Sequence, residues 1–284
     1  MWLADQWKDY ELLDCGRGEK LERWGDKLLV RPDPQAIWST PRSHQGWKKP
    51  DARYARSSTG GGQWADKSVP QRWQIHYRDL TFNVGLMNFK HTGVFPEQAA
   101  NWDFICDECR RIASSGRTPR VLNLFAYTGG ATLAARAAGA ETTHVDSVKQ
   151  VVTWARENME RSGLDGVRWI VEDALKFVRR EVRRGSRYDG IILDPPAYGR
   201  GANGEKWILE EHIGEMLAGC AGLLAPREAF LVLNLYSMGL SSTLARTAVR
   251  QAFGAPREEQ RGELCFTDRA GKELPLGTYY RMKR

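Results

Sequence analysis

The stretch Val121-Leu122-Asn123-Leu124-Phe125-Ala126-Tyr127-Thr128-Gly129-Gly130 decides the fold. Residues 121–125 are a short apolar run, which predicts a buried strand, and residues 131–138 are rich in alanine, which predicts a helix. The two glycines between them permit a tight turn and a close approach of the backbone to a ligand. The turn differs from the G-x-G-x-x-G loop of dinucleotide sites, and by itself it also fits an ordinary strand-to-helix connection.

The pattern of strand followed by helix continues from about residue 97 onward. Further strands are predicted over residues 142–145, 167–171, 188–193 and 229–235, with two more near 262–267 and 278–282. Helices are predicted over residues 147–161, with Ser147 as the cap, and over 174–184, 206–224 and 241–253. This alternation predicts an α/β fold with a doubly wound, Rossmann-like parallel sheet and right-handed crossovers.

Residues 1–90 have a different composition. Seven of the eleven tryptophans lie there, and short runs broken by turn formers predict strands at 10–13, 22–24 and 27–30, with a closing hairpin at 73–77 and 80–86. Residues 39–70 are rich in Ser, Gly, Pro, Lys and Arg, which predicts a long irregular connection. The chain therefore divides into a small β-rich domain, 1–90, and a larger α/β domain, 91–284.

The overall composition excludes several classes of protein. The chain has 284 residues, of which 42% are hydrophobic and 27% charged, as in globular proteins and unlike disordered or fibrous chains. No apolar run approaches the roughly 20 residues of a membrane span, and the N-terminus lacks the pattern of a signal peptide. Five scattered cysteines do not form a disulfide framework, so we expect a cytoplasmic protein. The net charge of +7 suits a polyanionic partner without requiring one.

The sequence predicts no metal site. Cys106 and Cys109 form a lone C-x-x-C pair, which cannot fill a tetrahedral zinc site, and the five histidines show no ligand spacing. A run of basic residues between Lys176 and Arg187 is able to follow a phosphate backbone, but a solvated helix face explains it better.

Acidic residues follow two of the predicted strands. In a doubly wound sheet, ligands bind at the carboxyl ends of the strands, near the point where strand order reverses. Asp146 lies about 20 residues past the glycine turn, where a carboxylate accepts both hydroxyls of a ribose. Asp173 follows the third strand and is placed to accept from an adenine amino group. Each also fits the simpler role of a helix cap, so the prediction depends on the strand ends acting together.

The fourth strand ends in Asp194-Pro195-Pro196-Ala197-Tyr198. The two prolines fix the backbone and lack N–H groups, which leaves carbonyl oxygens and a carboxylate to face a ligand. A planar amine beside these acceptors, with the Tyr198 ring stacked on it, is the substrate that this segment predicts. A rigid exit from the strand explains the prolines, but not the combination of Asp, two prolines and an aromatic residue.

Residues 125–129, Asp146, Asp173 and 194–198 together resemble the ordered motifs of class I S-adenosylmethionine-dependent methyltransferases. More narrowly, His91-Thr92-Gly93-Val94-Phe95-Pro96-Glu97-Gln98 followed by residues 123–130 resembles the large-subunit ribosomal RNA methyltransferase family. That family shows His-Lys-Thr-Gly with a following Asp-Gln, then Leu-Phe-x-Tyr-Thr-Gly-Gly and Asp-Pro-Pro-x-Phe. The resemblance covers about residues 90–240, and the combined motifs are far more specific than any single one.

The resemblance implies a methyltransferase with S-adenosylmethionine as cofactor and RNA, ribosomal RNA in particular, as substrate. The turn at 123–129 would hold the methionine part, Asp146 the ribose and Asp173 the adenine amine. Residues 1–90 do not visibly match the RNA-binding module of the longer family members, but we expect them to help bind the RNA or another substrate. The implied cofactor-binding residues are Thr92, Phe95, Gln98, Asn123, Phe125, Ala126, Tyr127, Thr128, Gly129, Asp146, Ser147, Asp173, Ala174 and Asp194. The implied catalytic residues, which would hold the acceptor, are Asp194, Pro195, Pro196 and Tyr198.

The sequence departs from the family pattern at several positions. The Lys of the His-Lys-Thr-Gly stretch is missing, and Glu97 stands where the family usually has Asp. Members that methylate carbon 5 of cytosine use a cysteine near the end of the fifth strand, whereas residues 233–238 here read Leu-Asn-Leu-Tyr-Ser-Met. Cys220 and Cys265 do not match that position. Because an unactivated pyrimidine carbon requires a thiolate, we expect a nitrogen acceptor.

Other functions remain open on the sequence. The same fold serves methylation of protein side chains and small molecules, and a non-catalytic RNA-binding protein can retain a relic of the cofactor pocket. A nicotinamide-dependent oxidoreductase is a further alternative, disfavoured because no G-x-G-x-x-G follows the first strand.

Overall fold

The computed structural model describes residues 2–4, 6–57, 61–65, 68–87, 89–201, 204–236 and 240–284. They form two compact units. The α/β unit contains Trp2, Ala100–Leu264 and Gly277–Arg284, and the β-rich unit contains Leu3–Ala99 and Cys265–Leu276, so that strands β1, β16 and β17 pass from one unit to the other. Whether residues 1–90 act as a domain that binds RNA or another substrate stays a prediction. In the described part of the chain, no helix is long and apolar enough to span a membrane.

The α/β unit is built around a mixed sheet in the order β1-β16-β17-β15-β12-β9-β10-β11. Its strands are β1 (Trp2–Leu3), β9 (Arg120–Leu124), β10 (Glu141–Asp146), β11 (Arg168–Val171), β12 (Gly190–Leu193), β15 (Phe230–Leu235), β16 (Glu258–Thr267) and β17 (Glu273–Lys283). From β15 to β11 the strands run parallel, as the alternation predicts, but β17 runs antiparallel to β15. The prediction of a wholly parallel sheet is wrong at this edge, because the short loop between β16 and β17 leaves no room for a crossover helix.

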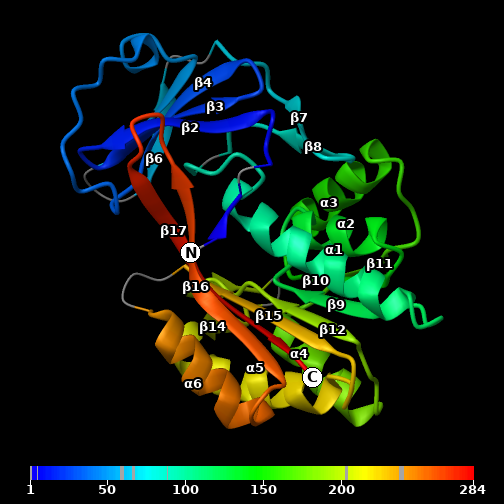
Figure 1. The fold of residues 1–284 in the computed structure, drawn as a ribbon. Coiled ribbons are helices and arrows are strands. Elements are labelled where there is room, and N and C mark those ends of the chain that lie inside the picture. Colours follow the sequence, from blue (N-terminus) through cyan, green and yellow to red (C-terminus); the bar gives the residue numbers. More distant parts are fainter. Residues whose placement is uncertain are drawn as a thin grey trace. The chain divides into compact units, whose positions relative to one another are not determined.

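Helices cover both faces of the sheet (Figure 1). On one face lie α1 (Ala99–Ala113), α2 (Gly130–Ala137) and α3 (Lys149–Arg161), and on the other lie α4 (Ala174–Arg183), α5 (Leu209–Leu223) and α6 (Ser242–Phe253). Successive side chains of β9 point to opposite faces. Val121 packs in the core that includes residues of α1 and α2, whereas Leu122 and Leu124 pack with residues of α4, α5 and α6. The doubly wound α/β architecture is therefore confirmed.

Strand order reverses beside β9. The chain passes from β9 to β10 and β11 on one side, and then returns to place β12 on the other side of β9. The carboxyl ends of β9 and β12 consequently meet at the switch point, which is where open α/β sheets bind their ligands.

The start of α3 differs from the prediction. Ser147 is not its cap, because the N-cap residue is Val148 and no side chain makes a capping hydrogen bond there. Instead, Asp146 Oδ1 accepts a hydrogen bond of 2.9 Å from the Val148 amide. A carboxylate accepts more strongly than a serine hydroxyl, so Asp146 takes over this task.

The β-rich unit contains a sheet in the order β2-β3-β4-β5-β6 and a separate hairpin of β7 and β8. These strands are β2 (Tyr10–Gly16), β3 (Glu19–Trp24), β4 (Lys27–Pro32), β5 (Ala52–Arg56), β6 (Gly62–Ala65), β7 (Trp73–Tyr77) and β8 (Leu80–Val84). The predicted closing hairpin is confirmed, but the irregular connection predicted over residues 39–70 is wrong, since it contains β5 and β6. Buried Trp47, Tyr54 and Trp64 supply the apolar contacts that order this polar segment.

Candidate functional site

The loop between β9 and α2 has a strained backbone. Phe125 and Tyr127 have φ values of 55° and 48°, in the left-handed region that side chains other than glycine rarely adopt. The Ala126 amide donates to the Val145 carbonyl oxygen, and the Gly129 amide donates to the Ala126 carbonyl oxygen. Strain of this kind costs roughly 1–3 kcal/mol per residue and gathers at ligand sites. A loop held in this way at the switch point points to ligand binding.

Asp146 holds this loop from the end of β10. Its Oδ2 accepts a hydrogen bond of 2.9 Å from the Tyr127 amide, while Oδ1 accepts from Val148. Burial raises the pKa of Asp146, and the backbone N–H groups that it binds oppose this rise. The structure therefore brings Asp146 to the glycine turn, as expected. Its contact with a ribose stays a prediction.

The Asn123 side chain is almost completely buried. It is 2% exposed, and its Nδ2 donates to Thr132 Oγ1 over 2.9 Å. The Thr132 hydroxyl is in turn 2.9 Å from Nδ1 of His144, whose pKa burial lowers to about 3, so this imidazole is neutral. These three side chains tie the start of α2 to β9 and β10. In the structure Asn123 supports the loop from below, and a direct contact with the cofactor stays a prediction.

The ends of β10 and β11 carry exposed apolar side chains that the sequence analysis missed. Val148 and Val171 are 45% and 47% exposed, and Asp146 is the register partner of Val171. Asp173 Oδ1 accepts a hydrogen bond from the Lys176 amide. This oxygen therefore caps α4, which confirms the helix-cap role. A flat apolar ring would cover the two valines beside these carboxylates. The signal was present in the sequence, because each valine lies within two residues of a strand-end aspartate.

Asp194 follows β12, and Asn234 holds it. The Asn234 side chain, which lies in β15, donates from Nδ2 to Asp194 Oδ1 over 3.1 Å. Pro195 is buried, whereas Tyr198 is 50% exposed and its hydroxyl oxygen accepts from Arg200 Nε. The Tyr198 ring is therefore exposed beside the strand end, and its stacking on a substrate stays a prediction.

A short hairpin follows this segment and corrects the prediction of a helix over residues 206–224. β13 (Tyr198–Arg200) pairs antiparallel with β14 (Lys206–Ile208), and α5 begins only at Leu209. Buried Trp207 explains the difference: its Nε1 donates to the Pro196 carbonyl oxygen over 2.7 Å, and its ring lies 4.8 Å from that of Phe125. Trp207 thus joins the loop after β12 to the loop after β9. Its role could not be predicted from the sequence, because neither contact is local.

Thr92, Phe95 and Gln98 belong to the β-rich unit. Thr92 is fully buried, and its carbonyl oxygen accepts from the Gly85 amide. Burial and nearby cations, Arg31 first among them, lower the pKa of the neighbouring His91 to about 4. The proposed closure of the cofactor pocket by this segment stays a prediction.

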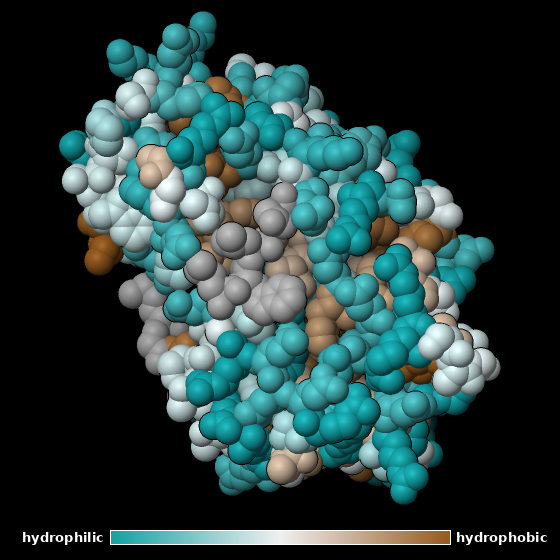
Figure 2. All heavy atoms as spheres, in the orientation of Figure 1, coloured by the Kyte–Doolittle hydropathy of each residue, from teal (hydrophilic) through white to brown (hydrophobic). Residues whose placement is uncertain are grey.

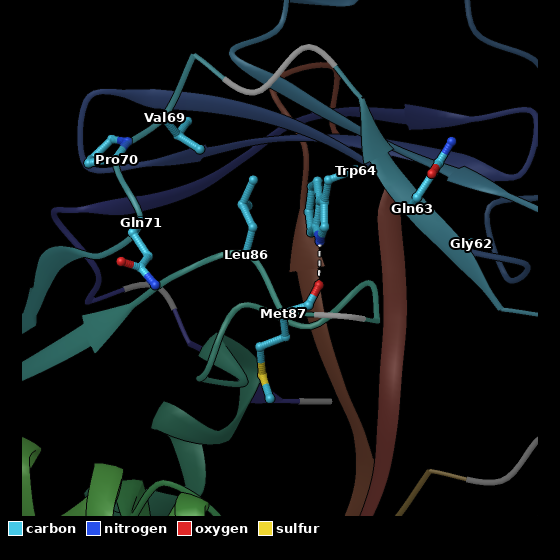
Figure 3. A pocket seen from close by; sticks show the side chains of 8 residues that line it. All are labelled: Gly62, Gln63, Trp64, Val69, Pro70, Gln71, Leu86 and Met87. Carbon is cyan, nitrogen blue, oxygen red and sulfur yellow. Dashed lines mark hydrogen bonds between the residues drawn. The ribbon is translucent and has the colours of Figure 1, made fainter.

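The β-rich unit also contains a cavity of about 480 Å³ (Figure 3). Its lining is Gly62, Gln63, Trp64, Val69, Pro70, Gln71, Leu86 and Met87. Trp64 Nε1 donates to the carbonyl oxygens of Met87 and Phe89, over 2.8 and 3.1 Å, which fixes the indole ring as one wall. Among the described residues of this lining there is no acid, base or nucleophile.

Two arginines of α4 and the arginine that follows its last residue are paired with acids. Arg179 binds Glu215, Arg180 binds Glu172, and Arg184 binds Glu181. This favours a solvated helix face over a track for phosphates.

Hydrophilic residues form most of the face seen in Figure 2. Among the described residues, no group of three His, Cys, Asp or Glu side chains is placed to hold a metal ion.

The comparisons with known proteins identify the family. A model of the S-adenosylmethionine-dependent methyltransferases matches residues 38–256. The chain belongs to this family. A solved SAM-dependent methyltransferase from Agrobacterium tumefaciens is 37% identical, with a TM-score of 0.92, over 99% of this chain and 92% of that one. The chain is therefore an S-adenosylmethionine-dependent methyltransferase with S-adenosylmethionine as its cofactor, and the oxidoreductase alternative is set aside.

Curated relatives of the methyltransferase include two enzymes named for ribosomal RNA. Ribosomal RNA large subunit methyltransferase K/L of Shewanella frigidimarina is 30% identical over 157 residues, which are 54% of this chain and 21% of that protein. Ribosomal RNA large subunit methyltransferase I of Aeromonas salmonicida is 28% identical over 210 residues, which are 69% of this chain and 48% of that protein. The chain spans between a fifth and a half of the length of these relatives.

The described residues fit the cofactor of the family. The strained loop offers backbone groups at the switch point, Asp146 offers a half-buried carboxylate, and Val148 and Val171 offer an apolar surface. When bound, S-adenosylmethionine supplies an electrophilic methyl group on a sulfonium. The protein's part is to position the acceptor atom in line with that group and to exclude water.

Proposed function

We propose that this methyltransferase modifies RNA, ribosomal RNA in particular, on a nitrogen of a base. The observation that carries the proposal is the acceptor character of the segment after β12. Pro195 and Pro196 provide no N–H, and Asn234 turns its own N–H groups toward Asp194 Oδ1. A base amine is the donor that this arrangement complements. The printed names of the curated relatives support RNA as the substrate, and such a substrate favours a cytoplasmic protein.

In the proposed reaction, Asp194 is the charged side chain that binds the acceptor amine. Its carboxylate accepts a hydrogen bond from the base amine, which orients the nitrogen lone pair toward the methyl group. Transfer would form the N–C bond while the bond between the methyl group and the sulfonium sulfur breaks, which leaves a neutral thioether. The Asp194 carboxylate would stabilise the positive charge on the nitrogen and take up its departing proton. Tyr198 stacks on the base, and Pro195 and Pro196 hold the segment rigid.

The cysteines support a nitrogen acceptor over carbon 5. Cys220 is fully buried within α5, where burial raises the pKa of its thiol, and Cys265 belongs to the β-rich unit. A buried neutral thiol is not a nucleophile. Residues 237–239, at the end of the fifth-strand segment, lie outside the described residues, but the sequence places no cysteine there.

Replacing Cys220 by serine should leave turnover unchanged. The substitution buries a hydroxyl in an apolar site, so we expect a loss of about 1–2 kcal/mol in the free energy of unfolding and a kcat per folded molecule equal to that of the wild type. Thermal melting and initial rates measure the two effects. A covalent complex with RNA containing fluorinated cytosine or uracil, absent in Cys220→Ser or Cys265→Ser, would overturn the nitrogen assignment.

The experiment that tests the substrate uses labelled S-adenosylmethionine with separate acceptor pools. RNA from cells lacking the protein, an RNA-depleted protein extract and a small-molecule extract are each incubated with enzyme, and the RNA nucleosides are analysed by mass spectrometry. One methylated nucleoside in RNA, on a nitrogen, is expected. Label in protein or in small molecules alone would favour the alternative acceptors, and cofactor binding without transfer to any pool would favour a non-catalytic relic.

A further inference from the structure

Asn234 is a polar residue in a strand that is otherwise apolar. β15 reads Phe-Leu-Val-Leu-Asn-Leu and is buried along its whole length, and Asn234 itself is 1% exposed. Its Nδ2 donates to Asp194, but its Oδ1 is buried and has no hydrogen-bond partner. A buried, unpaired amide oxygen destabilises the folded state, so a leucine here would favour folding more than the asparagine does. The hydrogen bond to Asp194 is therefore the feature that accounts for an asparagine at this position.

The bond between the two side chains crosses from a rigid element to a loop. Asn234 is fixed within a central strand, whereas Asp194 is the first residue after β12 and begins the connection to β13. Because a carboxylate only accepts, the amide nitrogen must be the atom that faces it, and this sets the orientation of the whole amide. The hydrogen bond in turn restricts the rotation of the Asp194 carboxylate.

We propose that Asn234 is a positioning residue that fixes the Asp194 carboxylate for the acceptor amine. The inference rests on the proposed role of Asp194 and names the residue that makes it effective. Asn234 does not touch the reacting atoms in this proposal. It acts by removing the rotational freedom of Asp194, at the expense of an unpaired oxygen in the core.

The test is Asn234→Leu, which keeps the number and branching of the side-chain heavy atoms. We expect an equal or higher melting temperature, unchanged affinity for S-adenosylmethionine, and a fall in kcat on the order of 10²-fold, with a much smaller change in KM for the acceptor. A merely structural role predicts the reverse, namely a lower melting temperature with normal turnover of the folded molecules. Normal turnover of this variant overturns the inference.

Thr142→Val is the matched control. Thr142 is 3% exposed, and its Oγ1 is likewise buried without a partner. It lies near the amino end of β10, however, whereas the candidate site lies at the carboxyl ends of the strands. This variant also removes an unpaired buried oxygen. It should therefore keep or gain stability, as Asn234→Leu does, while its turnover equals that of the wild type.

A second variant, Asn234→Asp, gives a pH signature that a packing defect does not produce. Above neutral pH two facing carboxylates repel each other, and Asp194 is displaced. As the pH falls, the pair takes up one shared proton, and the hydrogen bond is restored. The kcat of this variant relative to wild type should therefore rise as the pH falls, whereas the ratio for Asn234→Leu stays flat. A flat ratio for Asn234→Asp counts against the inference.

The two proposals fail in different ways. Turnover is measured with whichever acceptor pool the wild-type protein methylates. The Asn234 variants can therefore still be tested if the acceptor is not RNA. Conversely, wild-type methylation of RNA combined with normal turnover of Asn234→Leu removes the positioning role and leaves the proposed function standing.

Discussion

Replacing Asp194 by alanine should lower kcat by about 10²–10³-fold, the loss typical of removing one preorganised polar contact at a reacting group. The carboxylate is the charged acceptor after β12, and Asn234 holds it in place. Binding of S-adenosylmethionine should weaken far less, because the loop after β9 and Asp146 stay intact. Initial rates at saturating cofactor, with cofactor affinity measured by calorimetry, separate the two effects.

Asp194→Asn sharpens this test. The substitution keeps the size of the side chain but removes its charge, and because Asn234 requires an acceptor, it turns the new amide N–H groups toward the substrate. We therefore expect this variant to be nearly as slow as Asp194→Ala. Turnover close to wild type would show that neither the charge nor the acceptor character of Asp194 is needed.

Asp189 gives a matched control at the other end of the same strand. It precedes β12, is 7% exposed, and accepts from the Arg120 amide and from Arg117 Nη1, each over 2.9 Å. Asp189→Asn should lower the melting temperature while leaving kcat per folded molecule unchanged. We thus expect the aspartate at the start of the strand to serve stability and the one at its end to serve the reaction.

Replacing Asp146 by alanine should weaken S-adenosylmethionine binding by at least tenfold. Charge-assisted hydrogen bonds are worth about 1.5–3 kcal/mol each, and this carboxylate is expected to accept from the ribose hydroxyls. The variant also frees the Tyr127 amide, so the strained loop loses one of its anchors. Calorimetry with S-adenosylmethionine measures the change, and equal affinity would remove Asp146 from the site.

The exposed Asp165 serves as the control for this substitution. It precedes β11 and so lies at the amino ends of the strands, away from the candidate site. Its side chain is 90% exposed and forms an ion pair with Arg136. Asp165→Ala should leave cofactor affinity unchanged. A similar loss in both variants would indicate a general effect of charge rather than a contact at the site.

The pH dependence of cofactor binding follows from the same carboxylate. Burial raises the pKa of Asp146, so it takes up a proton at a higher pH than an ordinary aspartate does. The protonated form has lost its charge and part of its acceptor capacity. Cofactor affinity should therefore fall as the pH is lowered into the acidic range, and Asp146→Asn should bind weakly with little dependence on pH. An identical pH profile in both proteins would contradict the assignment.

The sequence by itself determined the order of the elements and the acids at the strand ends. Residues 121–130 predicted the strand, the turn and the helix correctly, and Asp146 and Asp194 lie where that order places them. These features could be predicted because apolar runs, glycine turns and helix caps act over a few neighbouring residues. Parallel strands then bring their carboxyl ends to one edge whatever the details of packing.

Only the tertiary structure decided which side chains support those acids. Trp207 was predicted in a helix, yet it closes a hairpin against Pro196 and Phe125, and Asn234 reaches Asp194 from a strand 40 residues away in the chain. Residues 39–70 looked irregular because their polar composition hides two strands, of which β5 pairs with β4 and β6 pairs with β5. In each case the deciding contact joins residues far apart in sequence. Local propensity does not contain that information, because burial in the folded chain outweighs it.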